Sequence, residues 1–201
     1  MQKPFRKGAR LRHTNNVLAA ATIAISLYTL LLPWLPSLWF FAQERAADTS
    51  SPEKQAQVVK EKTTNPKPGN WLYIPRLKLE EKINEGTDLR ALNTGVWRRP
   101  NTARPNNGNN TVIVGHRFTY DGKSVFYNLD KVKSGDTIAL RWEGKTYKYL
   151  VKETKVVSAT AVEIEEETTE KQLTLYTCTP LWSAKDRLVI VSQPVDLGEN
   201  E

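Results

Sequence analysis

The stretch that decides the fold is LTLYTCTPLWSAKDRLVIV, residues 173–191. It contains two short runs rich in β-branched and aromatic residues, which predict strands over Gln172–Thr177 and Leu188–Ser192. The proline-containing segment between them is typical of a turn or loop. The only cysteine of the chain, Cys178, follows the first run, and Arg187 precedes the second. If the two strands are antiparallel neighbours, this thiol and this guanidinium lie close together.

Short apolar runs and turn signals continue through the region upstream. They predict further strands at Trp71–Ile74, Thr111–Gly115, Thr137–Trp142 and Tyr147–Val157, one short helix at Asp88–Gly95 with Asp88 as N-cap, and a loop at Pro100–Asn110. Helical periodicity longer than about ten residues is absent from this region. Several short strands in one domain of this size imply an all-β barrel or sandwich.

Alternation of side chains along a strand predicts which residues share a face. Three such sets are Val112, Val114 and His116; Thr174, Tyr176 and Cys178; and Arg187, Val189 and Val191. His116 is one of only two histidines, and it too follows a strand-like run. Spacing alone does not bring His116 to the other two candidates, because that requires tertiary packing.

A long uncharged segment precedes the folded region. No charged residue lies between Thr14 and Gln43, and Val17–Ala42 is mostly apolar. A helix of this length, at about 1.5 Å per residue, exceeds a hydrocarbon core of about 30 Å. A cleaved secretory signal is the alternative, but no small-x-small pair cleanly follows the apolar run, which favours an uncleaved anchor.

Charge and composition organise the rest of the chain. The net charge of +7 comes mostly from five basic residues before position 14, so the sequence does not predict nucleic-acid binding. The same residues predict a cytoplasmic N-terminus and an extracellular domain, in a single-pass protein of the cell membrane. The expected segments are a cytoplasmic basic tail (1–13), a transmembrane signal anchor (14–42), an extracytoplasmic linker with a helical piece around Glu53–Glu61 (43–70), a catalytic β-barrel domain (71–195) and a C-terminal tail (196–201).

A thiol, an imidazole and a guanidinium are the groups needed for nucleophilic attack on a peptide carbonyl. A thiolate is the nucleophile, a nearby imidazole moves protons, and a guanidinium stabilises an oxyanion or orients the substrate backbone. Taken singly, each residue has a plainer interpretation: a packed Cys178, a structural His116 or a solvated Arg187. A closed zinc site is disfavoured, because the chain contains neither a CxxC nor an HxxxH motif.

Together the motifs resemble those of sortases, the bacterial cysteine transpeptidases. Thr174–Cys178 reads TLYTC and matches the family's TLxTC motif, VGHR at 114–117 resembles its histidine strand, and RLVIV at 187–191 resembles its arginine strand. The resemblance covers about residues 71–195, and the chain order of the three motifs agrees. Details around His116 and Cys178 look most similar to class D and class E sortases.

The resemblance implies a closed eight-stranded β-barrel with short helices. Cys178 would be the nucleophile, His116 the general acid and base, and Arg187 the ligand of the oxyanion or substrate backbone. Thr177 and Val114 would contribute to substrate binding. The enzyme would cleave a sorting signal similar to Leu-Pro-x-Thr-Gly between Thr and Gly, and an amine of a peptidoglycan precursor or a pilin subunit would resolve the thioacyl-enzyme.

Some alternatives stay open. A cysteine endopeptidase resolved by water and a non-catalytic surface-binding β-domain are the competing functions. The resemblance implies no cofactor and no metal, although the glutamates of the loop at 158–171 leave an acidic calcium site, as in some class A members, as an alternative. The sequence shows no long C-terminal extension or second span, which disfavours a dedicated pilin polymerase.

Overall fold

The computed structural model describes residues 7–32, 51–64 and 67–195. The chain forms two compact units, Met1–Gln43 and Glu44–Glu201. The predicted C-terminal tail over 196–201 lies outside the described residues, as do the end of the predicted anchor and the start of the predicted linker.

The first unit contains one helix, α1 (Lys7–Leu31), among its described residues. From Arg12 to Leu31 this helix is long and apolar enough to cross a membrane, with a mean hydropathy of 1.4. It begins ahead of the predicted anchor, because lysine and arginine favour helices and do not interrupt one. A signal sequence has the same length and composition, so the cleaved-signal alternative stays open.

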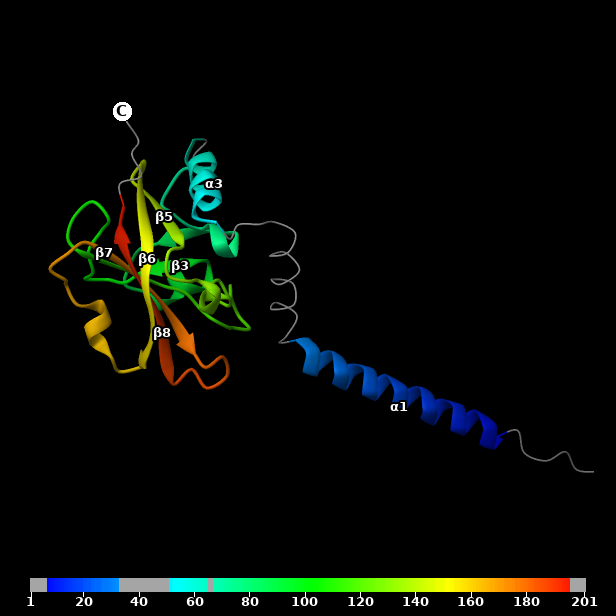
Figure 1. The fold of residues 1–201 in the computed structure, drawn as a ribbon. Helices are drawn as coiled ribbons and strands as arrows, with labels where there is room; N and C mark the ends of the chain where they lie inside the picture. Colours follow the sequence, from blue (N-terminus) through cyan, green and yellow to red (C-terminus); the bar gives the residue numbers. More distant parts are fainter. Residues whose placement is uncertain (1–6, 33–50, 65–66, 196–201) are drawn as a thin grey trace, which may run out of the picture. The chain divides into compact units, whose positions relative to one another are not determined.

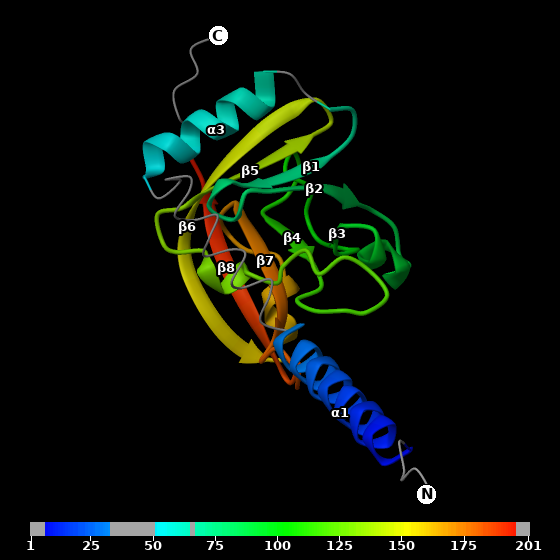
Figure 2. The same cartoon turned by 90° about the vertical axis from the view of Figure 1, so that its right-hand side faces the viewer.

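The second unit is built on eight strands, coloured from green to red in Figure 1. They are β1 (Trp71–Ile74), β2 (Leu79–Asn84), β3 (Val96–Arg98), β4 (Asn110–Val114), β5 (Thr137–Trp142), β6 (Lys145–Ser158), β7 (Gln172–Thr179) and β8 (Asp186–Pro194). Each strand pairs with the next in the order β1-β2-β3-β4-β7-β8-β6-β5, and β5 pairs back to β1. The expected closed eight-stranded barrel is therefore confirmed (Figure 2).

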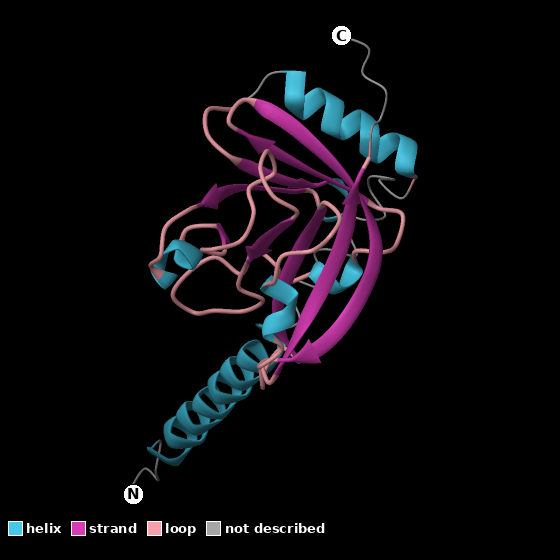
Figure 3. Ribbon diagram, turned by 90° about the vertical axis from the view of Figure 1, so that its left-hand side faces the viewer, coloured by secondary structure: helices cyan, strands magenta, loops and turns pink. Residues whose placement is uncertain are grey.

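Short 3-10 helices connect the strands and lie outside the sheet (Figure 3). They are η2 (Pro75–Leu77), η3 (Leu89–Asn93), η4 (Leu129–Lys131) and η5 (Val162–Glu165). The helix predicted at Asp88–Gly95 corresponds to η3, and its predicted N-cap is confirmed: the Asp88 side chain accepts a hydrogen bond of 2.9 Å from the backbone N–H of Arg90.

The sequence did not predict β2 and β3. Alternation in β2 is only partial, and β3 has three residues, too few to give a periodic signal. The strands predicted at the catalytic end are present and longer than expected. β7 continues through Cys178 to Thr179, and β8 begins at Asp186.

Alternation sorts the side chains of the sheet between the barrel interior and its outer face. Leu173, Leu175, Leu188 and Ile190 belong to the main buried core of the barrel. Their neighbours on the opposite face form a second, smaller apolar cluster. This outer cluster consists of Val112, Tyr176 and Val189, with Val114, Val157, Ile164 and Val191 packed against it.

The helix expected within the linker is α3 (Pro52–Thr64), and it packs on the barrel next to β5 (Figures 1 and 2). Val59 and Gln55 are fully buried. The Gln55 amide donates to Asp136 Oδ1 at 2.8 Å, and its carbonyl oxygen accepts from the backbone N–H of Thr137 at 2.7 Å. Arg76 Nε also donates to Asp136, at 3.0 Å. These buried polar contacts fix α3 in one register on the barrel.

Candidate active site

The register of β7 and β8 brings Cys178 and Arg187 together. They are directly paired residues of antiparallel strands, and Arg187 is in turn paired with Val157 of β6. Residues paired in this way have side chains on the same face of the sheet. The prediction that the two strands are antiparallel neighbours is therefore confirmed.

This face is the outside of the barrel. Tyr176 lies two residues before Cys178 and belongs to the outer cluster, whereas Leu175 lies in the core. Cys178 is a half-buried free thiol. The half-buried nucleophile candidate therefore stands on the outer face of the barrel, at the end of the outer cluster.

His116 follows β4, which runs parallel to β7 with Val114 paired to Tyr176. The ladder continues for one more residue, because the Gly115 N–H donates to the Tyr176 carbonyl at 3.4 Å. His116 is thus two positions beyond Val114, as Cys178 is two positions beyond Tyr176. The parallel pairing of β4 and β7 therefore brings positions 116 and 178 to the same end of the sheet.

Gly115 has a steric reason to be glycine. A Cβ atom built at this position would meet the Phe126 ring at 2.8 Å, closer than carbon atoms pack. The same Phe126 donates its backbone N–H to the His116 carbonyl at 2.9 Å. The dipeptide Gly115-His116 therefore fits between β7 and the Phe126 ring.

Burial controls the protonation of the imidazole. His116 is half-buried, and this desolvation holds the pKa of its side chain below the usual 6.5. The neutral imidazole is therefore the prevailing form near pH 7. A neutral His116 is able to accept a proton from a thiol.

The Arg187 side chain is held over the loop between β7 and β8. Its Nη1 donates to the carbonyl oxygens of Ala184 at 2.9 Å and Asp186 at 3.0 Å. A guanidinium carries five N–H donors, and these two bonds use only Nη1. The role of Arg187 toward a substrate carbonyl or an oxyanion stays a prediction.

The two residues predicted to bind substrate lie differently. Val114 is half-buried and packs against the outer cluster. Thr177 is fully buried, and its hydroxyl donates to the Gly115 carbonyl at 2.8 Å. This bond gives Thr177 a part in placing the segment that carries His116, and its contact with substrate stays a prediction.

The loop from β6 to β7 covers the outer cluster. Ile164 of η5 packs on that cluster, and Glu165 accepts hydrogen bonds from Tyr176 Oη at 2.6 Å and Arg99 Nε at 2.8 Å. Burial and the Glu165 carboxylate both raise the pKa of Tyr176. A surface cavity of about 630 Å³ lies beside this junction, with Trp97 and Arg99 in its lining.

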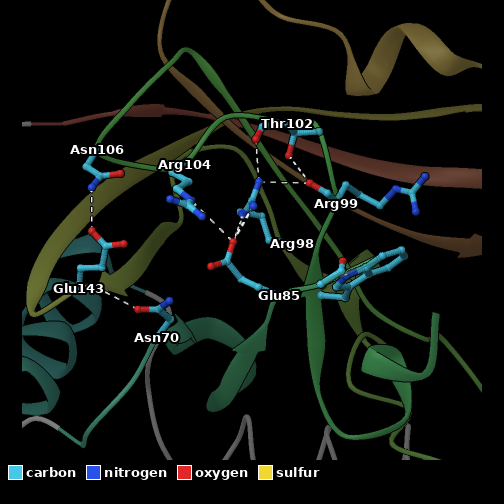
Figure 4. A network of polar contacts seen from close by, with 10 residues as sticks. Asn70, Glu85, Arg98, Arg99, Thr102, Arg104, Asn106 and Glu143 are labelled. Atoms are coloured by element: carbon cyan, nitrogen blue, oxygen red, sulfur yellow. Dashed lines mark hydrogen bonds and ion pairs between the residues drawn. The ribbon is translucent and has the colours of Figure 1, made fainter. Parts of the chain in front are cut away.

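The loop from β3 to β4 is held by its own polar contacts (Figure 4). Arg98 Nε donates to Glu85 Oε1 at 2.7 Å, and Arg98 Nη1 donates to the Thr102 carbonyl at 2.6 Å. The Thr102 hydroxyl closes the turn by donating to the Arg99 carbonyl at 2.8 Å. Arg99 thus lies at the base of an ordered turn, from which its guanidinium reaches Glu165.

The described residues contain no group of three or more His, Cys, Asp or Glu side chains able to hold a metal ion. Of the glutamates predicted as an alternative calcium site, Glu165 binds Arg99 and Tyr176, and Glu167 accepts from the backbone N–H of Asn109 at 2.6 Å. The calcium alternative is not tested by these contacts.

One side chain at the site was not singled out by the sequence. Arg117 directly follows His116, and its Nη1 donates to the hydroxyl of Thr179, the residue after Cys178, at 2.9 Å. The only sequence signal was its place in the VGHR motif.

Comparison with known proteins agrees with the fold and the motifs. Residues 72–195 match the Sortase domain family model. The chain is 27% identical to Sortase D of Bacillus subtilis over 157 residues, which cover 76% of this chain and 77% of that protein. It is 28% identical to Sortase A of Listeria monocytogenes over 122 residues, 61% of this chain and 54% of that protein.

Solved structures give the same result. A lid mutant of Sortase A from Corynebacterium diphtheriae superimposes with a TM-score of 0.61 at 29% identity, covering 77% of this chain and 85% of that one. A pilus-related Sortase C of Group B Streptococcus gives a TM-score of 0.59 at 27% identity, covering 64% and 67%. A family model that matches well over half of the chain, on a barrel with this topology, places the chain in the sortase family, whose members are cysteine transpeptidases.

Proposed function

We propose that this chain is a membrane-anchored cysteine transpeptidase with Cys178 as its nucleophile. It cleaves a sorting signal similar to Leu-Pro-x-Thr-Gly between Thr and Gly and joins the Thr carbonyl to an amine of the cell wall or of a pilin subunit. The observation that supports the proposal is the register of β4, β7 and β8, because Cys178 is paired with Arg187 and β4, which ends two residues before His116, runs parallel to β7.

The reaction starts from neutral groups. His116, whose pKa is lowered by burial, accepts the thiol proton as Cys178 Sγ attacks the Thr carbonyl carbon. A C–S bond forms, and the carbonyl oxygen becomes an oxyanion beside the donors of Arg187. The C–N bond then breaks, and His116 gives its proton to the leaving glycine amine.

The second half of the reaction reverses these roles. The acceptor amine attacks the thioacyl carbon and loses a proton to His116. The C–S bond breaks, and the thiolate recovers a proton from the imidazolium. A new amide bond has replaced the old one, so the step consumes no cofactor.

The half-buried residues of the outer cluster offer a floor for the substrate. Val114 and Val157 are half-buried and lie on the same face as Cys178. Val112 and Val189, by contrast, are fully buried. Apolar residues of a sorting signal would rest on this floor before the scissile bond reaches the thiol. Specificity for the signal would then depend on the β6–β7 loop that carries Ile164.

Localisation follows from α1. Its apolar composition, the basic residues near the start of the chain and membership of a family that is generally membrane-anchored support a single-pass protein with the barrel outside the cell. Proteins that carry a sorting signal are the substrates, and a peptidoglycan precursor or a pilin provides the amine.

The test uses the full chain in detergent with a Leu-x-x-Thr-Gly peptide library and a diaminopimelate or oligoglycine amine, with products identified by mass spectrometry. We expect cleavage after Thr and a ligated product, and no product from Cys178→Ala. No product from the wild type, with undiminished function of Cys178→Ala and His116→Ala, would instead favour a non-catalytic binding domain. Product partition that does not respond to added amine would favour the endopeptidase.

A further inference from the structure

Two side-chain hydrogen bonds join the strand ends on either side of the candidate catalytic pair. The Thr177 hydroxyl donates to the Gly115 carbonyl at 2.8 Å, and Arg117 Nη1 donates to the Thr179 hydroxyl at 2.9 Å. Each bond joins a residue next to Cys178 to a residue next to His116. Positions 116 and 178 therefore lie between the two bonds.

The first bond is internal and rigid. Thr177 points into the barrel, where it is fully buried, and its partner is a backbone carbonyl. Gly115 is held in addition by the Phe126 ring, which leaves no room for a Cβ atom. This bond fixes the point from which the His116 segment departs.

The second bond lies beyond the end of the paired part of β4. Arg117 is no longer in a strand, so no backbone ladder holds it beside β7. Its side chain is 14% exposed, and Nη2 makes an ion pair of 3.3 Å with Asp130. Asp130 belongs to η4, which is anchored in the core by the fully buried Leu129.

From these contacts we infer that Arg117 is a positioning residue, which with Thr177 holds His116 at a fixed distance from Cys178. A guanidinium suits this task, because its planar fork bonds two partners in different directions, the Thr179 hydroxyl and the Asp130 carboxylate. A lysine ammonium lacks that fork. The inference deepens the proposed function and rests on it for the roles of His116 and Cys178.

The test compares Arg117→Gln and Thr179→Val with Thr179→Ser, which keeps the hydroxyl. The first two remove the second bond, and they should lower kcat/KM by about 10- to 100-fold, the usual cost of misplacing a reacting group by about 1 Å. The loss should appear in kcat rather than in KM, because the substrate floor is unchanged. Thr179→Ser should stay close to the wild type.

A readout without substrate separates this inference from the proposed function. The rate at which iodoacetamide alkylates Cys178 is measured against pH in the full chain. Loss of the imidazole neighbour should lower this rate near pH 7, because a displaced His116 no longer accepts the proton of the thiol. If the wild type fails to process any sorting peptide, the proposed function fails, and the alkylation profiles still judge the positioning role.

Two controls address general damage. Arg90→Gln and Thr154→Val make the same chemical changes at exposed positions outside the β6–β7 loop and should leave both readouts unchanged. The double variant Arg117→Gln with Thr179→Val should lose no more activity than the worse single variant, because both substitutions break one bond. Alkylation profiles and kcat values of both single variants that match the wild type would overturn the inference, and so would fully additive losses.

Discussion

Replacement of Gln55 by leucine tests whether α3 is held by its polar contacts. Gln55 is fully buried, and its amide group satisfies two partners on the barrel, the Asp136 carboxylate and the Thr137 N–H. Leucine has a similar volume but neither donates nor accepts. Gln55→Leu therefore removes the hydrogen-bond partner that Gln55 provides to Asp136 Oδ1 and to the backbone N–H of Thr137, and both groups stay buried.

The expected cost follows from these two groups. A buried unsatisfied backbone N–H costs about 1–3 kcal/mol, and a lost bond to a charged acceptor costs about 1.5–3 kcal/mol. Extra apolar contact of the leucine offsets part of this, so we expect a net loss of about 2–4 kcal/mol of unfolding free energy. At about 2–4 °C per kcal/mol for a domain of this size, Tm should fall by roughly 5–15 °C.

The assay is thermal unfolding of the full chain in mild detergent, followed by far-UV circular dichroism. The matched control is Gln57→Leu, the same substitution on the same helix at an exposed position two residues away. It changes helix propensity equally and breaks no buried contact, so its Tm should stay near that of the wild type. Equal Tm values for Gln55→Leu and Gln57→Leu would refute the reasoning.

Three further predictions concern the site. Arg187→Lys should lower kcat/KM about 100-fold or more, because an ammonium lacks the planar fork; near-wild-type turnover in a peptide-cleavage assay would remove Arg187 from the mechanism. His116 binds its proton less readily in the folded chain than in the unfolded chain, so stability should fall as pH drops below 6.5. The unfolding free energy of His116→Gln, measured with urea, should depend less on pH below 6.5 than that of the wild type. An identical pH profile for the two proteins would count against the burial argument. Tyr176→Phe removes the 2.6 Å bond from Tyr176 to Glu165, and Glu165 then keeps its bond from Arg99. A glutamate-specific protease should then cut the β6–β7 loop faster, because the loop carries five glutamates. Unchanged cleavage would mean that the bond from Arg99 suffices to hold the loop.

The sequence predicted the catalytic end of the barrel well. Cys178 and Arg187 lie on strands with strong alternation, and their pairing across a short loop could be inferred from strand geometry. The resemblance of the motifs to those of sortases then implied the closed barrel and a role for His116 beside Cys178, which alternation alone could not predict. β3 escaped prediction because three residues give no measurable period.

The polar contacts that hold the site were beyond the reach of the sequence. Arg117 and Thr179 are 62 positions apart, Arg99 and Glu165 are 66 apart, and Gln55 and Asp136 are 81 apart. Such pairs have no periodic signature, and each residue taken singly looks like an ordinary surface group. Only the tertiary packing of the barrel brings them into contact.

Closure of the barrel limits how this chain could recognise a peptide substrate. All eight strands have hydrogen-bonded neighbours on both sides, because β5 pairs back to β1. Many proteins capture extended peptides by β-augmentation at an open sheet edge, where backbone bonds give affinity for almost any sequence. Parts of β2 (79–82) and β6 (153–158) pair on one side alone, and neither part carries Cys178. At Cys178, the segment that carries His116 lies along the β4 side of β7. A peptide beside Cys178 would therefore be recognised by the side chains and loops that face it. Substrate preference should therefore change through single residues of those loops, with the scaffold untouched.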